Sequence, residues 1–251
     1  MIKTLFRAFL IPVVAIIVVL LISYFYKNWE NPLIAAGTVG AAVAAIWAVI
    51  YLEIIKPYFD RPRLIIKEPG FKPSFYRQAP EKNRDGQQVG IGYYINILLK
   101  NIGKRTAKNC QPILTAMWKL NQGTWQKEEN WISVALRWGA GEDQYYEHGI
   151  LKQREERNLI PNRPYYLSLG RISTHDCQIF ELLQVIILNA QDHRFEPGEY
   201  CFEVAVNGED IDPPVKYFKV RWDGKCTGNL NEVNERFFVS MDDNPPSNSA
   251  Q

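Results

Sequence analysis

The sequence predicts an N-terminal transmembrane α-helical hairpin followed by an all-β C-terminal domain, an antiparallel β-sandwich. Two observations predict the hairpin: residues 8–26 and residues 32–52 are apolar runs without a charged side chain. Each run is about as long as the ~20-residue helix that crosses a hydrocarbon core. The sandwich is predicted by a third observation, because short segments with strand-like apolar patterns follow one another between residues 64 and 239. Strict period-2 alternation, clearest near the C-terminus, is typical of half-buried strands.

The chain is expected to divide at the points where these patterns change. The expected parts are a two-helix transmembrane hairpin at 1–56 (spans about 8–26 and 32–55), a linker with the first strand at 57–68, a β-sandwich domain at 69–241, and a disordered tail at 242–251. A secretory signal peptide is the alternative for the first run. That run is longer than the ~7–15 apolar residues of a signal peptide, and no small-x-small cleavage site follows it.

Lysine and arginine placement predicts the orientation of a multi-pass protein in the cell membrane. Both flanks of the hairpin are richer in basic residues than its connecting loop, which holds only Lys27. Since cytoplasmic flanks carry the excess of basic residues, both termini and the C-terminal domain are expected to be cytoplasmic. The four cysteines are widely spaced (Cys110, Cys177, Cys201 and Cys226). They would be buried thiols in a reducing cytosol, and two disulfides remain possible under the opposite orientation.

The second span carries small residues at helical spacing, namely Ala36, Gly37, Gly40, Ala41, Ala44 and Ala48. Small residues let helix backbones approach closely in lipid. This surface could pack against the first span of the same chain, or it could join copies into a homo-oligomer. Neither span contains an ionisable residue within its apolar run, which argues against a transporter. An anchoring or oligomerising role in the lipid bilayer is therefore expected.

The C-terminal domain is expected to hold eight or nine short strands. The expected strands are residues 64–67, 94–100, 110–120, 132–138, 165–169, 182–187, 199–206, 215–222 and 237–239, with a short helix at 180–184 as an alternative. Residues 69–90 and 139–157 are rich in polar and turn-forming residues and are expected to be loops. The prolines of residues 57–62 are expected to stop the second helix.

Two short motifs resemble those of a known family. The Asn101-Ile102-Gly103 turn, followed by Ala107 and Cys110, is similar to a turn of prokaryotic Ig-like modules of the cell-adhesion-related (CARDB-like) type. The Pro197-Gly198-Glu199-Tyr200 segment resembles the start of a late strand in those modules. The resemblance implies an Ig-like sandwich with a binding or spacer role. The long insertions at 69–90 and 139–158 depart from the compact pattern of the family.

The candidate binding residues are aromatic. Four tryptophans and two tyrosines fall close together in the sequence: Trp118, Trp125, Trp131, Trp138, Tyr145 and Tyr146. Aromatic rings of this kind bind sugars, peptides or bases by stacking, although core packing uses them as well. The local cluster His175-Asp176-Cys177 could ligate a metal or activate a cysteine nucleophile; the alternative is a loop histidine beside a buried cysteine. No catalytic motif, metal site or cofactor site is expected.

Two functional hypotheses follow from this organisation. The first is a membrane-anchored, non-enzymatic binding or scaffold protein that presents a β-sandwich to an unknown protein or small ligand. The alternative resembles, in architecture, two-helix bacterial immune effectors, in which a cytosolic β domain senses a ligand and the helices oligomerise and perturb the membrane. An enzyme is a third hypothesis. A nucleic-acid partner is not expected, because residues 57–251 carry equal numbers of basic and acidic side chains and nucleic-acid binders are usually basic.

Overall fold

The structure is a computed structural model, and it describes residues 32–68, 76–83, 85–139, 144–147, 150–153, 156–185, 193–225 and 229–247. The chain divides into two compact units, Met1–Arg61 and Pro62–Gln251. The first expected span, 8–26, lies outside the described residues, and so do residues 248–251 of the expected tail.

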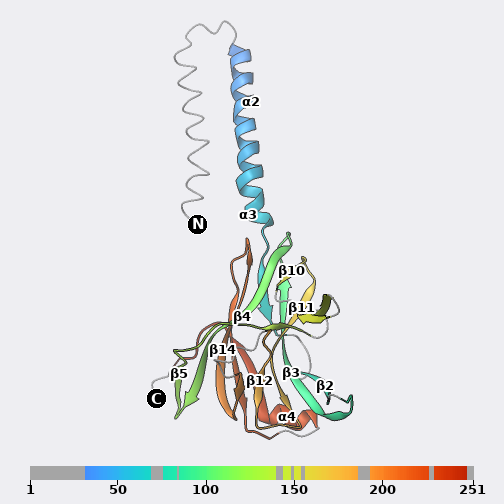
Figure 1. Cartoon of the computed structure of the whole chain (residues 1–251). Coiled ribbons are helices and arrows are strands. Elements are labelled where there is room, and N and C mark those ends of the chain that lie inside the picture. The colour runs from blue at the N-terminus through green and yellow to red at the C-terminus, as the bar shows by residue number, and fades with distance from the viewer. Residues whose placement is uncertain are drawn as a thin grey trace. The chain divides into compact units, whose positions relative to one another are not determined.

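The described part of the first unit is one continuous helical segment (Figure 1). It consists of the α-helix α2 (Pro32–Ile50), the π-helical turn η1 (Tyr51–Ile55) and the α-helix α3 (Lys56–Asp60). Among the described residues, the stretch Gly40–Asp60 is the one helix long and apolar enough to cross a membrane. The chain therefore has one candidate membrane-spanning helix in the described range.

The expectation that Pro57 stops this helix is wrong. Pro57 stands in the first turn of α3, directly after the π-helical turn in which the Lys56 N–H bonds to the Tyr51 carbonyl. A proline inside a continuous helix lacks an N–H for the preceding turn, and a local π-type adjustment of the hydrogen bonds accommodates it. The helix ends at Asp60 instead. Arg61, which precedes Pro62, has the extended conformation that a following proline favours.

The small-residue surface of the second span is open in the structure. Gly40, Ala41, Ala44 and Ala48 are all exposed, and a Cβ atom placed on Gly40 would meet no atom within 4 Å. Ala36 and Gly37 lie in α2, but their side chains are outside the described set. Close helix packing through this surface stays a prediction.

The second unit is mostly antiparallel β-sheet. One seven-stranded sheet contains β1 (Leu64–Lys67), β2 (Tyr76–Lys82), β3 (Gln88–Asn101), β7 (Arg137–Trp138), β11 (Pro164–Ser173), β12 (Phe180–Leu182) and β13 (Arg194–Phe195). Its main order is β1-β3-β11-β12-β13, while β2 pairs with β3 and β7 pairs with β11.

The other seven-stranded sheet has the order β10-β4-β14-β15-β16, and β5 and β6 also pair with β4. Its strands are β4 (Ala107–Asn121), β5 (Thr124–Lys127), β6 (Val134–Ala135), β10 (Arg157–Leu159), β14 (Gly198–Glu209), β15 (Val215–Trp222) and β16 (Phe237–Asp242). A separate hairpin joins β8 (Gln144–Glu147) and β9 (Ile150–Gln153), and a short helix, α4 (Leu230–Arg236), precedes β16.

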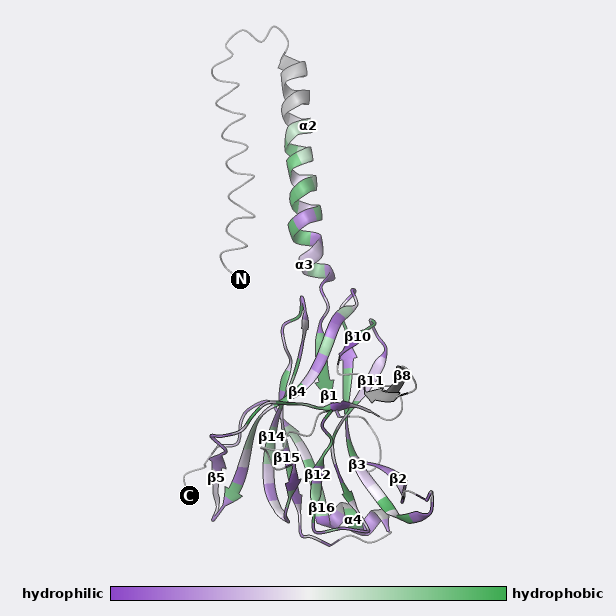
Figure 2. Ribbon diagram, in the orientation of Figure 1, coloured by the Kyte–Doolittle hydropathy of each residue, from purple (hydrophilic) through white to green (hydrophobic). Residues whose placement is uncertain are grey.

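The core lies between the two large sheets. Apolar residues that alternate along the strands point inward, and Figure 2 shows hydrophobic and hydrophilic positions interleaved along the strands. In β14, Tyr200, Phe202 and Val204 are buried in one continuous cluster with residues of the other sheet, including Phe180 of β12. Two antiparallel sheets packed on a shared core are the arrangement expected of a β-sandwich.

The most regular strand predictions are confirmed. The expected strands at 64–67 and 215–222 match β1 and β15, and the expected segments at 94–100 and 110–120 lie inside β3 and β4. The tail begins later than expected, because Asp242 still belongs to β16.

The two long loops were predicted wrongly. Residues 69–90 contain β2 and the start of β3, and residues 139–157 contain β8, β9 and the first residue of β10. Pro80 lies within β2, which among the described residues pairs only with β3, and an edge strand tolerates proline. The segment 132–138 forms only the two short strands β6 and β7. The expected strand at 182–187 is wrong in its bounds, because β12 spans Phe180–Leu182. The alternative helix at 180–184 does not form, and residues 186–187 lie outside the described residues.

The Asn101 turn is fixed by one buried side chain. The Asn101 amide nitrogen donates to the carbonyls of Arg105 and Leu159 at 2.7 and 2.9 Å, and its oxygen accepts from the backbone N–H of Gly103 at 2.9 Å. It also accepts from the backbone N–H of Arg63 at 3.2 Å. A fully satisfied buried amide of this kind specifies one local conformation, and it explains why asparagine stands at this turn.

The cysteines fall into two groups. Cys110 and Cys201 are free, buried thiols, and burial raises the pKa of each to about 12. Such thiols stay protonated and unreactive at neutral pH. Cys177 is disulfide-bonded, so of the two alternatives given by the sequence, buried thiols or disulfides, the disulfide holds at this residue.

Candidate functional site

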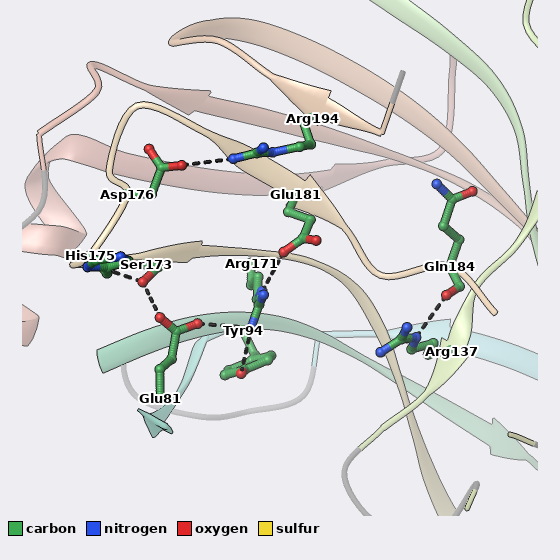
Figure 3. Close-up of polar contacts among 10 residues, drawn as sticks. All are labelled: Glu81, Tyr94, Arg137, Arg171, Ser173, His175, Asp176, Glu181, Gln184 and Arg194. Atoms are coloured by element: carbon green, nitrogen blue, oxygen red, sulfur yellow. Dashed lines mark hydrogen bonds and ion pairs between the residues drawn. The ribbon is translucent and has the colours of Figure 1, made fainter. Parts of the chain in front are cut away.

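The described residues form a polar groove around Arg171, which is called the Arg171 groove below (Figure 3). It has a volume of about 440 Å³ and is lined by Glu81, Arg171, Ser173, His175, Asp176, Ile179, Glu181, His193 and Arg194. Cavities of roughly 300–1,000 Å³ are typical of small-molecule sites. The charged lining distinguishes this groove from the apolar interior of the sandwich.

Strand register builds the floor of the groove. Across β3, β11, β12 and β13 the directly paired residues are Tyr94 with Arg171, Arg171 with Glu181, and Glu181 with Arg194. Directly paired residues of antiparallel strands point to the same face of the sheet. The side chains of Arg171, Glu181 and Arg194 therefore stand in one row.

Glu81 reaches this row from β2 because of a glycine. Gly92 of β3 pairs with both Ala79 and Ser173. A Cβ atom on Gly92 would lie 3.0 Å from the Glu81 Oε1 and 2.8 Å from the Tyr94 ring. Without a side chain at residue 92, the Glu81 carboxylate lies over the sheet and contacts Ser173 and Arg171.

Arg171 is held by two carboxylates and a phenol. Its Nε donates to the Glu181 Oε2 at 2.7 Å, and its Nη1 donates to the Glu81 Oε1 at 2.9 Å and to the Tyr94 hydroxyl at 3.4 Å. Burial by itself disfavours the charged guanidinium, but the hydrogen bonds to Tyr94 and Glu181 outweigh burial and raise the pKa of Arg171. The guanidinium is thus a fixed positive charge that joins β2, β11 and β12.

The opposite wall comes from the loop after β11 and from β13. Thr174 ties the start of the loop to β3: its N–H donates to the Ile91 carbonyl at 2.9 Å, and its Oγ1 accepts from the Ile91 N–H at 2.9 Å. The Asp176 Oδ2 accepts from the Arg194 Nη2 at 2.8 Å. Farther along the loop, the Gln178 Nε2 donates to the Gly224 carbonyl at 2.8 Å.

Several polar groups of the groove have no hydrogen-bond partner within the part of the chain that the structure describes. They are the Nη2 of Arg171, the Oε1 of Glu181, the Oδ1 of Asp176 and the imidazoles of His175 and His193. Polar groups that converge on a groove and lack protein partners can bind a ligand. In the same described segments, no group of three or more His, Cys, Asp or Glu side chains could hold a metal ion.

The predicted aromatic site residues are not brought together in one exposed surface. Trp138 is 1% exposed in the core, and Trp118 is 9% exposed and lies against the Tyr217 ring. The Trp131 Nε1 donates to the Leu114 carbonyl at 3.3 Å, and its ring packs on the core. Trp125 packs on a small cluster of Ala116, Trp118 and Cys201 on the other side of the second sheet. Tyr145 and Tyr146 lie in β8, where their side chains are outside the described set.

The His175-Asp176-Cys177 cluster is partly in the site. His175 and Asp176 line the Arg171 groove. The sulfur of Cys177 is in a disulfide, so it is neither a thiolate nucleophile nor a metal ligand. Sequence reasoning missed Glu81, Arg171, Glu181, His193 and Arg194. The signal available was alternation: Arg171 and Ser173 are polar residues two apart in a strand, on either side of Ile172.

No family model, no curated protein and no solved structure matches this chain. The Arg171 groove and the apolar helix Gly40–Asp60 are therefore the features on which a functional proposal rests.

Proposed function

We propose that this protein is a membrane-anchored, non-enzymatic binding protein whose β-sandwich takes a ligand in the Arg171 groove. The observation that carries the proposal is the set of unpartnered polar groups in a groove of about 440 Å³. The anchoring part is supported by the apolar helix Gly40–Asp60. The proposal includes the finer features expected from the sequence: a two-helix hairpin with a first span at 8–26, and an Ig-like strand arrangement.

The polar groups of the groove favour binding over catalysis. A nucleophilic hydroxyl needs a neighbouring base that is itself oriented by a third group. The Ser173 hydroxyl contacts Glu81, whose carboxylate is already paired with Arg171. Neither His175 nor His193 has a carboxylate partner on its imidazole among the described residues.

A bulky substitution that fills the Arg171 groove tests whether the groove binds a ligand, whatever the charge of that ligand. The detergent-solubilised full chain is heated in the presence of millimolar agmatine, glutarate or glucose, which are a cation, an anion and a neutral polyol. A ligand that binds the folded state raises the unfolding temperature by mass action. We expect a saturable rise with at least one probe, abolished by His175→Trp, which fills the groove. Val215→Trp, at an exposed position on β15, is the matched control. Failure of all three probes on the wild-type chain would reject the proposed groove.

Orientation is part of the proposal, and two observations bear on it. The basic residues after the second span (Lys56, Arg61, Arg63 and Lys67) support a cytoplasmic domain. The disulfide at Cys177 weighs against it, since the cytosol keeps most thiols reduced. An added cysteine in the tail should stay unlabelled by a membrane-impermeant maleimide in intact cells and react after lysis. Labelling in intact cells would place the domain on the outer side.

A two-helix effector is the second candidate function, supported by the exposed small residues of the second span. In that case induced expression depolarises cells, and Gly40→Leu or Ala44→Leu abolishes the effect because leucine blocks close helix approach. Val43→Leu, at an exposed position outside the small-residue surface, is the control. Harmless expression of the wild-type chain would eliminate this candidate.

A further inference from the structure

We propose that the Arg171 groove selects a cationic ligand group, an ammonium or a guanidinium. This inference rests on the proposed binding function and names the chemical class of the ligand. Its basis is the charge of the lining, the position of the unpartnered acceptors and the fixed state of Arg171.

The charged side chains that line the groove have a negative surplus. Three carboxylates, Glu81, Asp176 and Glu181, face two guanidiniums, Arg171 and Arg194. Each guanidinium already contacts a carboxylate: Arg194 lies 2.8 Å from Asp176, and Arg171 lies 2.9 Å from Glu81 and 2.7 Å from Glu181. The surplus is one negative charge beside Arg171. A cation restores neutrality in the groove, whereas an anion increases the imbalance.

The unpartnered acceptors are suited to the N–H groups of a cation. The Glu181 Oε1 and the Asp176 Oδ1 have no partner within the described segments. Glu181 comes from β12 and Asp176 from the loop after β11, so the two carboxylates approach the groove from different elements (Figure 3). Ammonium and guanidinium groups carry several donors and no acceptor. Charge-assisted bonds to two carboxylate oxygens would orient such a group.

Arg171 supports the carboxylates and is not arranged as an anion receptor. Its Nε and Nη1 are engaged by Glu181, Glu81 and Tyr94, so only Nη2 remains for an anion. Bidentate recognition of a carboxylate or phosphate uses two parallel N–H donors of one guanidinium. An anion at this arginine would have to displace a carboxylate that is already bound.

The size of the groove sets the size of the ligand group. A volume of about 440 Å³ holds a small diamine or one basic side chain, in the lower part of the ~300–1,000 Å³ range of ligand sites. The same chemistry has two sources: a free amine, or a lysine or arginine side chain of a peptide. The test below separates the sources by comparing agmatine with a capped Gly-Arg-Gly peptide.

The test measures whether affinity rises or falls when a negative or a positive charge is removed from the groove. Binding of agmatine, the capped peptide and glutarate to the detergent-solubilised full chain is measured by isothermal titration. Glu181→Gln keeps the side-chain shape and removes one negative charge, so agmatine should bind about tenfold more weakly, the loss typical of one charge-assisted hydrogen bond. Arg171→Gln increases the negative surplus and should tighten agmatine binding. Glu199→Gln is the matched control, since Glu199 also pairs with an arginine, Arg221, but on the other sheet.

The outcomes distinguish failure of the cation inference from failure of the proposed binding function. Weaker binding with Glu181→Gln and tighter binding with Arg171→Gln support a cationic ligand. The agmatine-to-peptide affinity ratio then identifies the source. The opposite signs, with glutarate as the bound probe, would overturn the cation inference while leaving the groove a binding site. Equal binding of agmatine by both variants and the wild-type chain would overturn the inference as well. Variants are compared only after circular dichroism shows wild-type β structure.

Discussion

The two faces of the part of the first sheet formed by β11, β12 and β13 have different surroundings, although the same strands build both. On the inner face, Phe180 and Phe195 pack in the apolar core. On the outer face, Arg171, Glu181 and Arg194 stand in a row and line a solvent-accessible groove. Successive side chains of a strand point to opposite faces, so neighbours such as Phe180 and Glu181 have opposite surroundings. We infer that the inner face supplies stability and the outer face is available for ligand binding.

The largest predicted effect is on the inner face. Phe180 is fully buried, and its ring centroid lies 5.4 to 6.4 Å from those of four other aromatic residues, Phe195, Phe202, Trp222 and Phe237. Phe180→Ala should lower the free energy of unfolding by about 3–5 kcal/mol, from lost burial and the cavity left behind. Urea unfolding followed by tryptophan fluorescence measures the loss. Phe238→Ala, on the exposed side of β16, should change stability by less than about 0.5 kcal/mol.

The next largest effect concerns the loop on the outer face. In the oxidised chain, Cys177→Ser should reduce the free energy of unfolding by about 2–4 kcal/mol, because a disulfide restricts the unfolded chain. The wild-type chain under reducing conditions should show the same loss, and Cys177→Ser should be insensitive to the reductant. The free thiols Cys110 and Cys201 stay unreactive at neutral pH, since burial raises the pKa of each to about 12. Wild-type stability that is independent of the reductant would contradict a structural disulfide.

The third prediction concerns the close contact between the β11 backbone at Gly170 and the Phe180 ring. A Cβ atom on Gly170 would lie 2.3 Å from the Phe180 ring and 2.8 Å from the Glu181 carbonyl. Gly170→Ala should therefore destabilise the domain by about 1–3 kcal/mol through overpacking, and it should shift β12 and weaken ligand binding. Gly198→Ala is the control, because a Cβ atom on Gly198 would meet its nearest neighbour, the Tyr200 ring, at 3.2 Å. Equal stability of the two variants would show that β12 moves aside without loss.

Local patterns predicted the long strands of the second sheet well. The strand 215–222 was predicted with its observed bounds because its side chains alternate strictly, and alternation is a property of neighbouring residues. The segment 199–206 was predicted to be a strand for the same reason, and it lies inside β14. The Asn101 turn was also visible, since asparagine and glycine two residues apart favour a turn.

The outer face could not be predicted because it depends on pairing between distant segments. Glu81 and Arg171 are ninety residues apart, and their contact needs the register of both β2 and β11 on β3. The β2 segment contains Pro80 and several charges, so its local pattern indicates a loop. Strand β13 has only two residues, which is too short to show any period. Charged residues on a strand also give no local sign of which partner they meet.

Apart from the surface controls, the smallest predicted stability effect belongs to the groove itself. The side chains of Arg171 and Glu181 are 34% and 30% exposed, and ion pairs with this much solvent access contribute little. Glu181→Gln should therefore change the free energy of unfolding by less than about 1 kcal/mol, while weakening agmatine binding about tenfold. Urea unfolding and isothermal titration on the same preparation measure the two quantities. A stability loss as large as that of Phe180→Ala would mean that both faces hold the fold together, and the functional contrast between them would then be wrong.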